Sequence, residues 1–411
     1  MARYLKTYRS YLRFDAYALI RHYCGFGRND DDFVDRLSRH YSVLIFSMFI
    51  IIVSSVQFVG KPISCWTPAS FTDSHISYAD FICWISSTYY VSTESEIPYP
   101  DEHREHSIIF YQYIPFLLML QAFGFFFPGF LWRSLSKKIG FSIQKYIDNL
   151  NLSRTLLIEP PSFRQQFVHN VAIRLDQYFR LKHGKKKMKT VFLSQFPKLT
   201  ILYLSIKLIY LCNILFQLFT LHYLMKFRLS LSSLVQQLFI HSTNYHHDSH
   251  QFPTNVLCDF IVRFLGKNTH RHTVQCVLPV NVFNEKIFTF SYLWLIIMML
   301  FSIYNLMFQW PFYLINKYDF INDYLIAQNK KKTNKFKKLT SDFTSSSLIN
   351  SNNSRDLSEQ KNEQILMKNF NEHYLKTDGI VLLRLIKINT DIVTTYNLLD
   401  DIWDLYRIQP I

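Results

Sequence analysis

The chain has 411 residues, of which 49% are apolar and 17% aromatic, and its formal net charge is +15. This composition excludes a chain that is disordered throughout, and a total of only nine glycines excludes a collagen-like fibre. One large domain or two ordinary domains are possible at this length. The class of protein depends on where the apolar residues lie.

Four runs are long and apolar enough to cross a bilayer. The run at 41–59 carries no charge, and a helix of that length spans a hydrocarbon core of about 30 Å. The runs at 108–131 and 287–315 are predicted spans for the same reason. A fourth run, 203–225, contains Lys207, which we expect to extend toward the interface because it lies near the helix end. The sequence therefore predicts four transmembrane helices.

The charges between these spans predict which side each loop faces. The connection 132–202 holds fourteen Lys or Arg against three Asp or Glu, whereas the only Lys or Arg in 60–107 are Lys61 and Arg104. Because short cytoplasmic loops carry the excess of Lys and Arg, the basic connection is predicted to be cytosolic. Both termini then share that side, and the loops 60–107 and 226–286 face outward. Topology thus explains much of the charge without a nucleic-acid partner.

Two terminal segments complete the predicted organisation. Residues 1–40 comprise an amphipathic N-terminal helix and its lead-in, with apolar residues at helical spacing among basic ones. Residues 316–411 form a tail that contains a flexible linker, about 329–362, rich in Lys, Ser and Asn. Aliphatic periodicity returns after this linker, so we expect tail helices to pack against the basic connection as a cytoplasmic dome.

Four of the six cysteines fall in the outward loops. Cys65 and Cys83 lie in the first, and Cys258 and Cys276 lie in the second. Two pairs on the oxidising side of a membrane predict two disulfides. Three pairings are possible, and the spacing does not choose among them: bonds across the loops would lock them into one lobe, and bonds within each would leave them independent. A four-cysteine zinc site lacks the close C-x-x-C spacing, so we expect no metal.

Enzyme chemistry finds no support in the motifs. The sequence has no G-x-S-x-G, P-loop or H-E-x-x-H pattern, and no carboxylates or histidines cluster inside the spans. We therefore expect no catalytic residues and no cofactor.

Several motifs, in the same order, resemble the innexin family of gap junction proteins. Residues 61–69 (KPISCWTPA) and 78–84 (YADFICW) look like its first outer loop, and 110–116 (FYQYIPF) is similar to its YYQWVPF signature. Residues 277–288 (VLPVNVFNEKIF) resemble the entry to its last membrane helix, and 378–385 (DGIVLLRL) resemble a segment of its tail. The residues that match the family signature are Tyr111, Gln112, Pro115, Pro279, Asn281, Asn284, Glu285 and Lys286.

The resemblance implies an all-α membrane protein with disulfide-bonded extracellular loops. It implies a subunit that assembles, with itself or with other innexin-like subunits, around a wide pore for ions and small solutes. Two such rings would dock through their outer loops to join adjacent cells at plasma-membrane junctions. The alternatives are a hemichannel that releases small solutes and a non-conducting adhesion or scaffold protein. Membrane lipid is a further expected partner, and nucleic acid is not.

Four residues are candidates for lining or gating the pore. The resemblance implies that the N-terminal segment folds into the pore mouth, which selects Arg3, Lys6 and Arg9. Plain anchoring of that helix at the membrane interface is the rival interpretation. Pro115 removes a backbone donor inside the second span and predicts a kink, which is either a gating hinge or a static bend.

Overall fold

A computed structural model describes most of the chain between Asp31 and Gln409. The described residues are 31–86, 88–91, 97, 99, 107–108, 110–138, 143–155, 161–184, 197–225, 252–264, 266, 268–316, 318–319, 321, 362 and 365–409. The N-terminal candidates Arg3, Lys6 and Arg9 lie outside these residues, as does the linker at 329–361.

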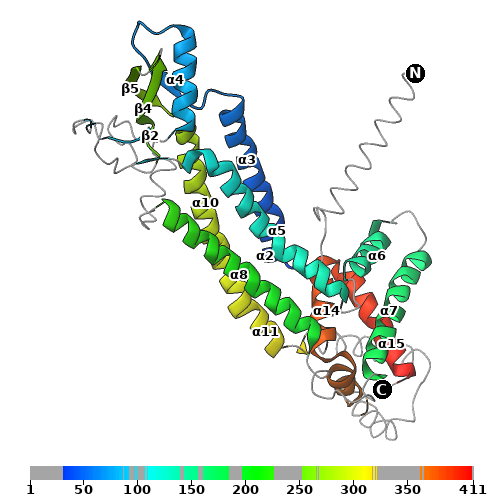
Figure 1. Ribbon diagram of the computed structural model, residues 1–411. Helices are drawn as coiled ribbons and strands as arrows, with labels where there is room; N and C mark the ends of the chain where they lie inside the picture. The colour runs from blue at the N-terminus through cyan, green and yellow to red at the C-terminus, as the bar shows by residue number, and fades with distance from the viewer. Residues whose placement is uncertain are drawn as a thin grey trace, which may run out of the picture. The chain divides into compact units, whose positions relative to one another are not determined.

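Four helical stretches of the described chain are long and apolar enough to cross a membrane (Figure 1), which confirms the predicted class. They run over Phe33–Phe58, Tyr111–Lys138, Lys198–Tyr223 and Pro279–Ile315. Their elements are α2 (Phe33–Arg36), the π-helical η1 (Leu37–Ser42) and α3 (Val43–Phe58); the 3₁₀ turn η2 (Phe110–Tyr113) and α5 (Ile114–Lys138); α8 (Lys198–Met225); and α10 (Pro279–Tyr304), the π-helical η4 (Asn305–Gln309) and α11 (Trp310–Ile315).

The proline positions in the second span differ from the expectation. Pro115 lies in the first turn of α5, directly after the 3₁₀ turn, where its missing N–H leaves no bond of α5 unmade. The proline inside α5 is Pro128, thirteen residues further along. The backbone condition for a proline kink within α5 is therefore met at Pro128 and not at Pro115.

The loops fold into a five-stranded sheet that the all-α description omits. Its order is β1-β5-β4-β2-β3, and each described pair of neighbours is antiparallel. The strands are β1 (Ser64–Trp66), β2 (Thr88–Tyr89), β3 (Ser107–Ile108), β4 (Asn255–Phe264) and β5 (Asn268–Val277), and the helix α4 (Asp73–Ile85) lies in the first loop. Val256, Cys258 and Phe260 alternate with more exposed residues in β4, which is the period-two pattern of a strand with one covered face.

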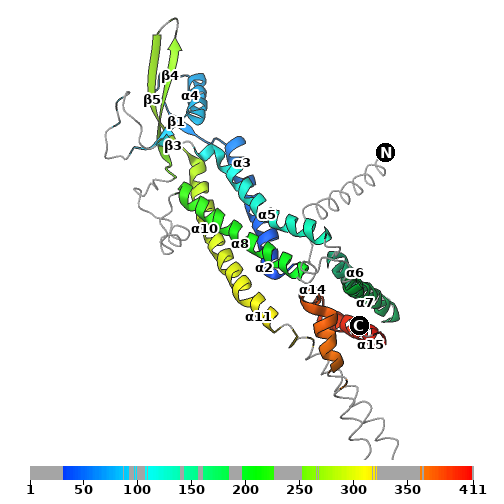
Figure 2. The same ribbon diagram turned by 60° about the horizontal axis from the view of Figure 1, so that its bottom comes forward.

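The strands β4 and β5 form a hairpin that extends beyond the rest of the sheet (Figure 2). They pair from Asn255 opposite Val277 to Phe264 opposite Asn268. Neighbouring strands reach only the base of this hairpin, where Cys65 of β1 lies opposite Cys276 and Tyr89 of β2 opposite Leu257. Gly266 in the turn has φ +82°, in the left-handed region that glycine adopts without strain.

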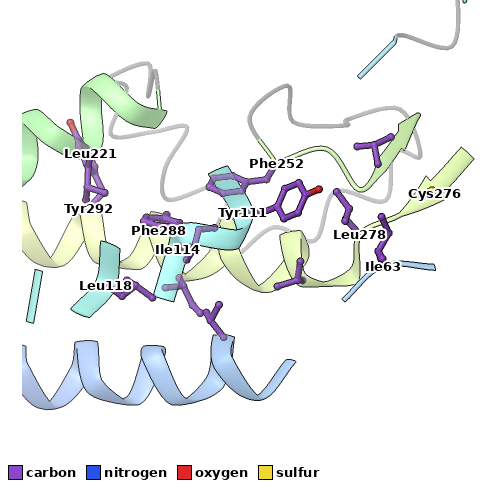
Figure 3. Packing of buried hydrophobic residues seen from close by; sticks show 14 of the residues in the cluster. Ile63, Tyr111, Ile114, Leu118, Leu221, Phe252, Cys276, Leu278, Phe288 and Tyr292 are labelled. Atoms are coloured by element: carbon purple, nitrogen blue, oxygen red, sulfur yellow. The ribbon is translucent and has the colours of Figure 1, made fainter. Parts of the chain in front are cut away.

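The described residues divide into two compact units, of which one comprises Leu37–Pro128 and Ile209–Ser302. A single apolar core in this unit joins the loops to the helices (Figure 3). The rings of Phe252 and Phe288 stack with centroids 5.6 Å apart, and Tyr111 and Leu278 are fully buried beside them. The loop lobe is therefore continuous with the packing of the helices that carry it.

The second unit comprises the described residues within Met1–Arg36, Gly129–Leu208 and Ile303–Ile411. The predicted tail helices are present and pack against the helices of the basic connection. The helices involved are α6 (Ile143–Thr155), α7 (Pro161–Gly184), the π-helical η5 (Phe370–Leu375), α14 (Lys376–Asn389) and α15 (Ile392–Ile408). Phe370 is fully buried and meets Trp403 and Tyr406 of α15 with ring centroids about 5 Å apart.

Candidate functional site

Two disulfides cross between the loops. Cys65 bonds to Cys276 and Cys83 bonds to Cys258, and these pairs are 211 and 175 residues apart in the sequence. Cys65 and Cys276 are opposite one another on adjacent strands, whereas Cys83 joins α4 to β4. The sulfurs of Cys65, Cys83 and Cys276 lie within 4.8 Å of one another, so the two bonds are neighbours. Of the pairings that the sequence left open, the structure contains the one that locks the two loops into a single lobe.

Two aspartates support this lobe. Asp80 of α4 accepts a hydrogen bond from the backbone N–H of Cys65 at 2.9 Å. Asp259 of β4 accepts from Tyr89, Arg271 and Thr273 at 2.7 to 3.0 Å. A carboxylate that accepts three donors from two strands fixes the pairing of those strands at that point.

The signature at the start of the second span connects the lobe to the helices. Tyr111 is fully buried, its ring lies 5.0 Å from that of Trp84, and its carbonyl accepts a hydrogen bond from Gln57 at 2.8 Å. Gln112 donates to the carbonyl of Trp84. Pro115 is buried. These contacts explain the signature as the attachment of α4 to α3 and α5.

The signature at the start of the fourth span performs a similar task. Pro279 is the first residue of α10, where its fixed φ favours helix initiation. The side chains of Asn281 and Asn284 are fully buried: Asn281 donates to the carbonyl of Pro253 at 2.9 Å, and Asn284 donates to Asn281 at 3.3 Å. Glu285 is partly exposed and Lys286 is exposed. The two asparagines thus tie the second loop to the helix that follows it.

A buried charge cluster lies in the other unit, and sequence reasoning misjudged it. Lys207 does not extend to an interface: it is 4% exposed, and its Nζ lies 2.6 Å from Asp32, 2.9 Å from Asp35 and 2.7 Å from the amide oxygen of Asn305. Trp310 donates to Asp32 at 3.0 Å. We refer to these five residues as the charge cluster. All three ammonium protons of Lys207 have an acceptor, which is why a lysine is tolerated there.

Two aspartates before the first span are the sequence feature from which this cluster could have been predicted. An uncompensated lysine in an apolar run requires a counter-charge, and Asp32 and Asp35 lie in the segment before the first predicted span, 41–59. Burial raises the pKa of Asp32, but the Lys207 ammonium and the hydrogen bonds outweigh burial and lower the pKa to about 2. Asp32 is therefore ionised at neutral pH and stabilises the folded state most above its ordinary pKa.

The tail motif DGIVLLRL is explained by helix α14, which binds the ends of three spans. Asp378 accepts two hydrogen bonds from Thr200, at 3.1 and 2.9 Å, and so caps the N-terminus of α8. Arg384 donates to the carbonyl of Asn316 at 3.0 Å, at the C-terminus of α11. Asn389 donates to the carbonyl of Asp31, just before α2.

Gly379 completes this motif. A Cβ atom at position 379 would lie 3.1 Å from the ring of Phe179, so the absence of a side chain allows α7 to approach α14 closely. One short helix of the tail is therefore fitted both to the basic connection and to the spans.

A multi-pass membrane protein with two loops joined by disulfides is the class that this geometry defines. The family model named Innexin matches residues 31–406. The chain is 31% identical over 389 residues to Innexin unc-9 of Caenorhabditis elegans, covering 92% of each chain. It is also 30% identical to Innexin-3 and 29% identical to Innexin eat-5 of the same organism, covering 91% and 90% of this chain and 83% and 85% of those proteins. The chain belongs to the innexin family.

The disulfide pairing predicts which thiol each cysteine variant releases. Cys65→Ser should make Cys276 reactive toward a membrane-impermeant maleimide while Cys258 stays protected, and Cys83→Ser should release Cys258 alone. Removal of either bond should cost about 2–5 kcal/mol of stability and sharply reduce surface function. The matched control is Cys212→Ser, because Cys212 has no disulfide. Labelling of Cys258 in the Cys65→Ser/Cys276→Ser double variant, which leaves no free lobe thiol to exchange with the second bond, would contradict the pairing.

The charge cluster predicts a large effect of Lys207→Met. The substitution leaves two buried carboxylates without their cation, so the free energy of unfolding of the purified protein should fall by about 3–5 kcal/mol. Lys137→Met, at an exposed lysine in the last turn of α5, should change it by less than about 0.5 kcal/mol. Adding Asp32→Asn and Asp35→Asn to Lys207→Met should restore part of the loss. Equal stability of the Lys207 and Lys137 variants would show that the ion pairs contribute nothing.

Proposed function

We propose that this chain is the subunit of a gap junction channel that passes ions and small solutes passively between adjacent cells. The observation that carries the proposal is family membership over nearly the whole chain, together with the two bonds that cross its loops. One bundle of four helices has too little polar surface to line a wide pore, so several copies, or copies with related subunits, would form the ring.

The proposed orientation places both termini and the basic connection 132–202 in the cytosol. The excess of Lys and Arg in that connection supports this assignment. The disulfide-bonded lobe would then lie outside the cell, where the redox environment preserves such bonds. The spans proposed from the sequence are 41–59, 108–131, 203–225 and 287–315.

The β4–β5 hairpin supports docking between two rings. Its outer half pairs only with itself among the described residues, and its residue Ile261 is 61% exposed. Lobes held rigid by two disulfides would meet an opposing ring with little loss of conformational entropy.

Paired cells that express only this protein test the channel proposal. Double voltage clamp should record current between the cells, and a small dye should pass from one cell to the other. A hemichannel would instead take up dye only from the medium, and a scaffold would conduct in neither assay. Labelling of the same cells with a membrane-impermeant amine reagent, which can reach the exposed Lys61 in the proposed orientation, supplies the surface-expression control. Absence of current with a second innexin subunit co-expressed would contradict the channel proposal.

The N-terminal residues Arg3, Lys6 and Arg9 are proposed to line the cytosolic mouth of the pore. Basic side chains there would hold a positive potential at the entrance. Cysteine placed at Lys6 or Arg9 and modified with a negatively charged thiol reagent should change single-channel conductance, whereas the same reagent on a cysteine at Lys137 should not. Unchanged conductance at both N-terminal positions would leave interfacial anchoring as the role of this helix. The sequence suggested a gating hinge at Pro115. Because Pro115 lies in the first turn of α5, a hinge that depends on a proline kink is proposed at Pro128, the proline inside that helix.

A further inference from the structure

An apolar groove lies on the surface of the second unit, between α8 and the end of the fourth span. Its volume is about 630 Å³, within the range of about 300–1,000 Å³ that holds small molecules. The residues that line it include Ile201, Ser205 and Leu208 of α8 and Leu306, Pro311 and Leu314 of η4 and α11.

The position of the lining residues decides what kind of molecule fits. All of them belong to stretches that are long and apolar enough to cross a membrane. Ser205 is small and Pro311 is compact, so the surface between the two spans is hollowed where larger neighbours would have filled it. A hollow left empty in the hydrocarbon layer would forfeit dispersion contacts along its whole length. In a bilayer the groove would be surrounded by lipid, so an acyl chain is the expected occupant.

The charges at one end of the groove favour an anionic headgroup. Lys198, Ile201, Ser205 and Leu208 are all exposed and share one face of α8, so Lys198 lies about one turn before the lining residue Ile201 on that face. Arg384 of α14 donates to the carbonyl of Asn316 at the C-terminus of α11 and supplies a second positive charge there.

The acidic groups at this end do not cancel both cations. Asp378 is 4% exposed and already accepts two hydrogen bonds from Thr200. The carboxylate of Asp319 is exposed and interacts electrostatically with the guanidinium of Arg384. Among the described residues at this end of the groove, Lys198 is therefore a charge that is open to a phosphate.

We propose that an anionic phospholipid binds here, with one acyl chain in the groove and its headgroup at Lys198. The inference rests on the proposed orientation, because it places this end of α8 at the cytoplasmic leaflet, where anionic lipids are concentrated. The bound lipid would fill the space between the third and fourth spans of a single subunit.

Lipid retention tests the proposal on the full-length protein. The protein is reconstituted in vesicles of equal phosphatidylserine and phosphatidylcholine, extracted again in detergent, and the lipid retained per subunit is measured by mass spectrometry. The native chain should retain phosphatidylserine over phosphatidylcholine by roughly fivefold, as one lysine near a membrane surface supports. Lys198→Gln should abolish this preference, and Ser205→Trp should remove the retained lipid of both kinds.

Matched controls separate a specific site from general lipid contact. Lys137→Gln removes an exposed lysine from the end of α5, and Leu215→Trp adds the same ring to the exposed face of α8 outside the groove. Neither should change retention. Because Lys198 is exposed, its variant reports on the site even where Ser205→Trp fails to fold.

Three results would overturn the proposal. The first is an unchanged preference for phosphatidylserine in Lys198→Gln, and the second is unchanged lipid retention in folded Ser205→Trp. The third is a change in the size of the protein–detergent particle in Ser205→Trp without loss of lipid, which would mean that a second copy of the chain fills the groove. Loss of current between paired cells with lipid retention intact would instead count against the channel function alone. A cysteine at position 198 that reacts with an impermeant reagent from outside the cell would reject the orientation.

Discussion

Two covalent bonds fix the geometry of the loops, and the rest of that unit depends on them. The bonded cysteines of the lobe are 175 and 211 residues apart in the sequence, so bringing their segments together carries a loop-closure cost that the disulfides reduce in the unfolded chain. Cys65 and Cys276 also set the strand register, since they are partners in the ladder. A shift by one residue would turn every covered side chain of β5 to the other face. The apolar core then continues from this sheet into the helices.

In the second unit, buried ion pairs hold distant segments together, whereas in the first unit disulfide bonds do so. The charge cluster joins the start of the first span, the third span and the fourth span through Lys207, whose side chain and both carboxylate partners are buried. The cluster contains two carboxylates and one ammonium. The side-chain amide of Asn305 and the indole N–H of Trp310 both donate to Asp32 and so stabilise the remaining negative charge. One π-helical segment, η4, begins with Asn305 of this cluster, and another, η1, begins two residues after Asp35. Such segments are frequent at functional sites.

Much of this was predictable from the sequence, and the failures have physical causes. Three of the four spans follow from uncharged runs of sufficient length, the span at 203–225 follows from an apolar run that contains Lys207, and the disulfide-forming cysteines follow from their loops. The pairing was not predictable, because spacing alone does not distinguish the three connectivities. The sheet was missed because its strands are short or lie in loops whose alternation is weak, as in β1 and β2 with three and two residues. Lys207 was misjudged because a lysine near a helix end is normally solvated, and its partners lie about 170 residues away.

The way α14 binds the spans has a consequence for the spacing of the tail sequence. Asp378, Arg384 and Asn389 each reach a different span end from one helix of 14 residues. Each residue added to a helix turns everything after it by about 100° and moves it by about 1.5 Å. A single insertion between Asp378 and Asn389 would therefore misalign one contact with the others. The segment is constrained in length as well as in composition, so a gain or loss of even one codon there is a more severe change than most substitutions.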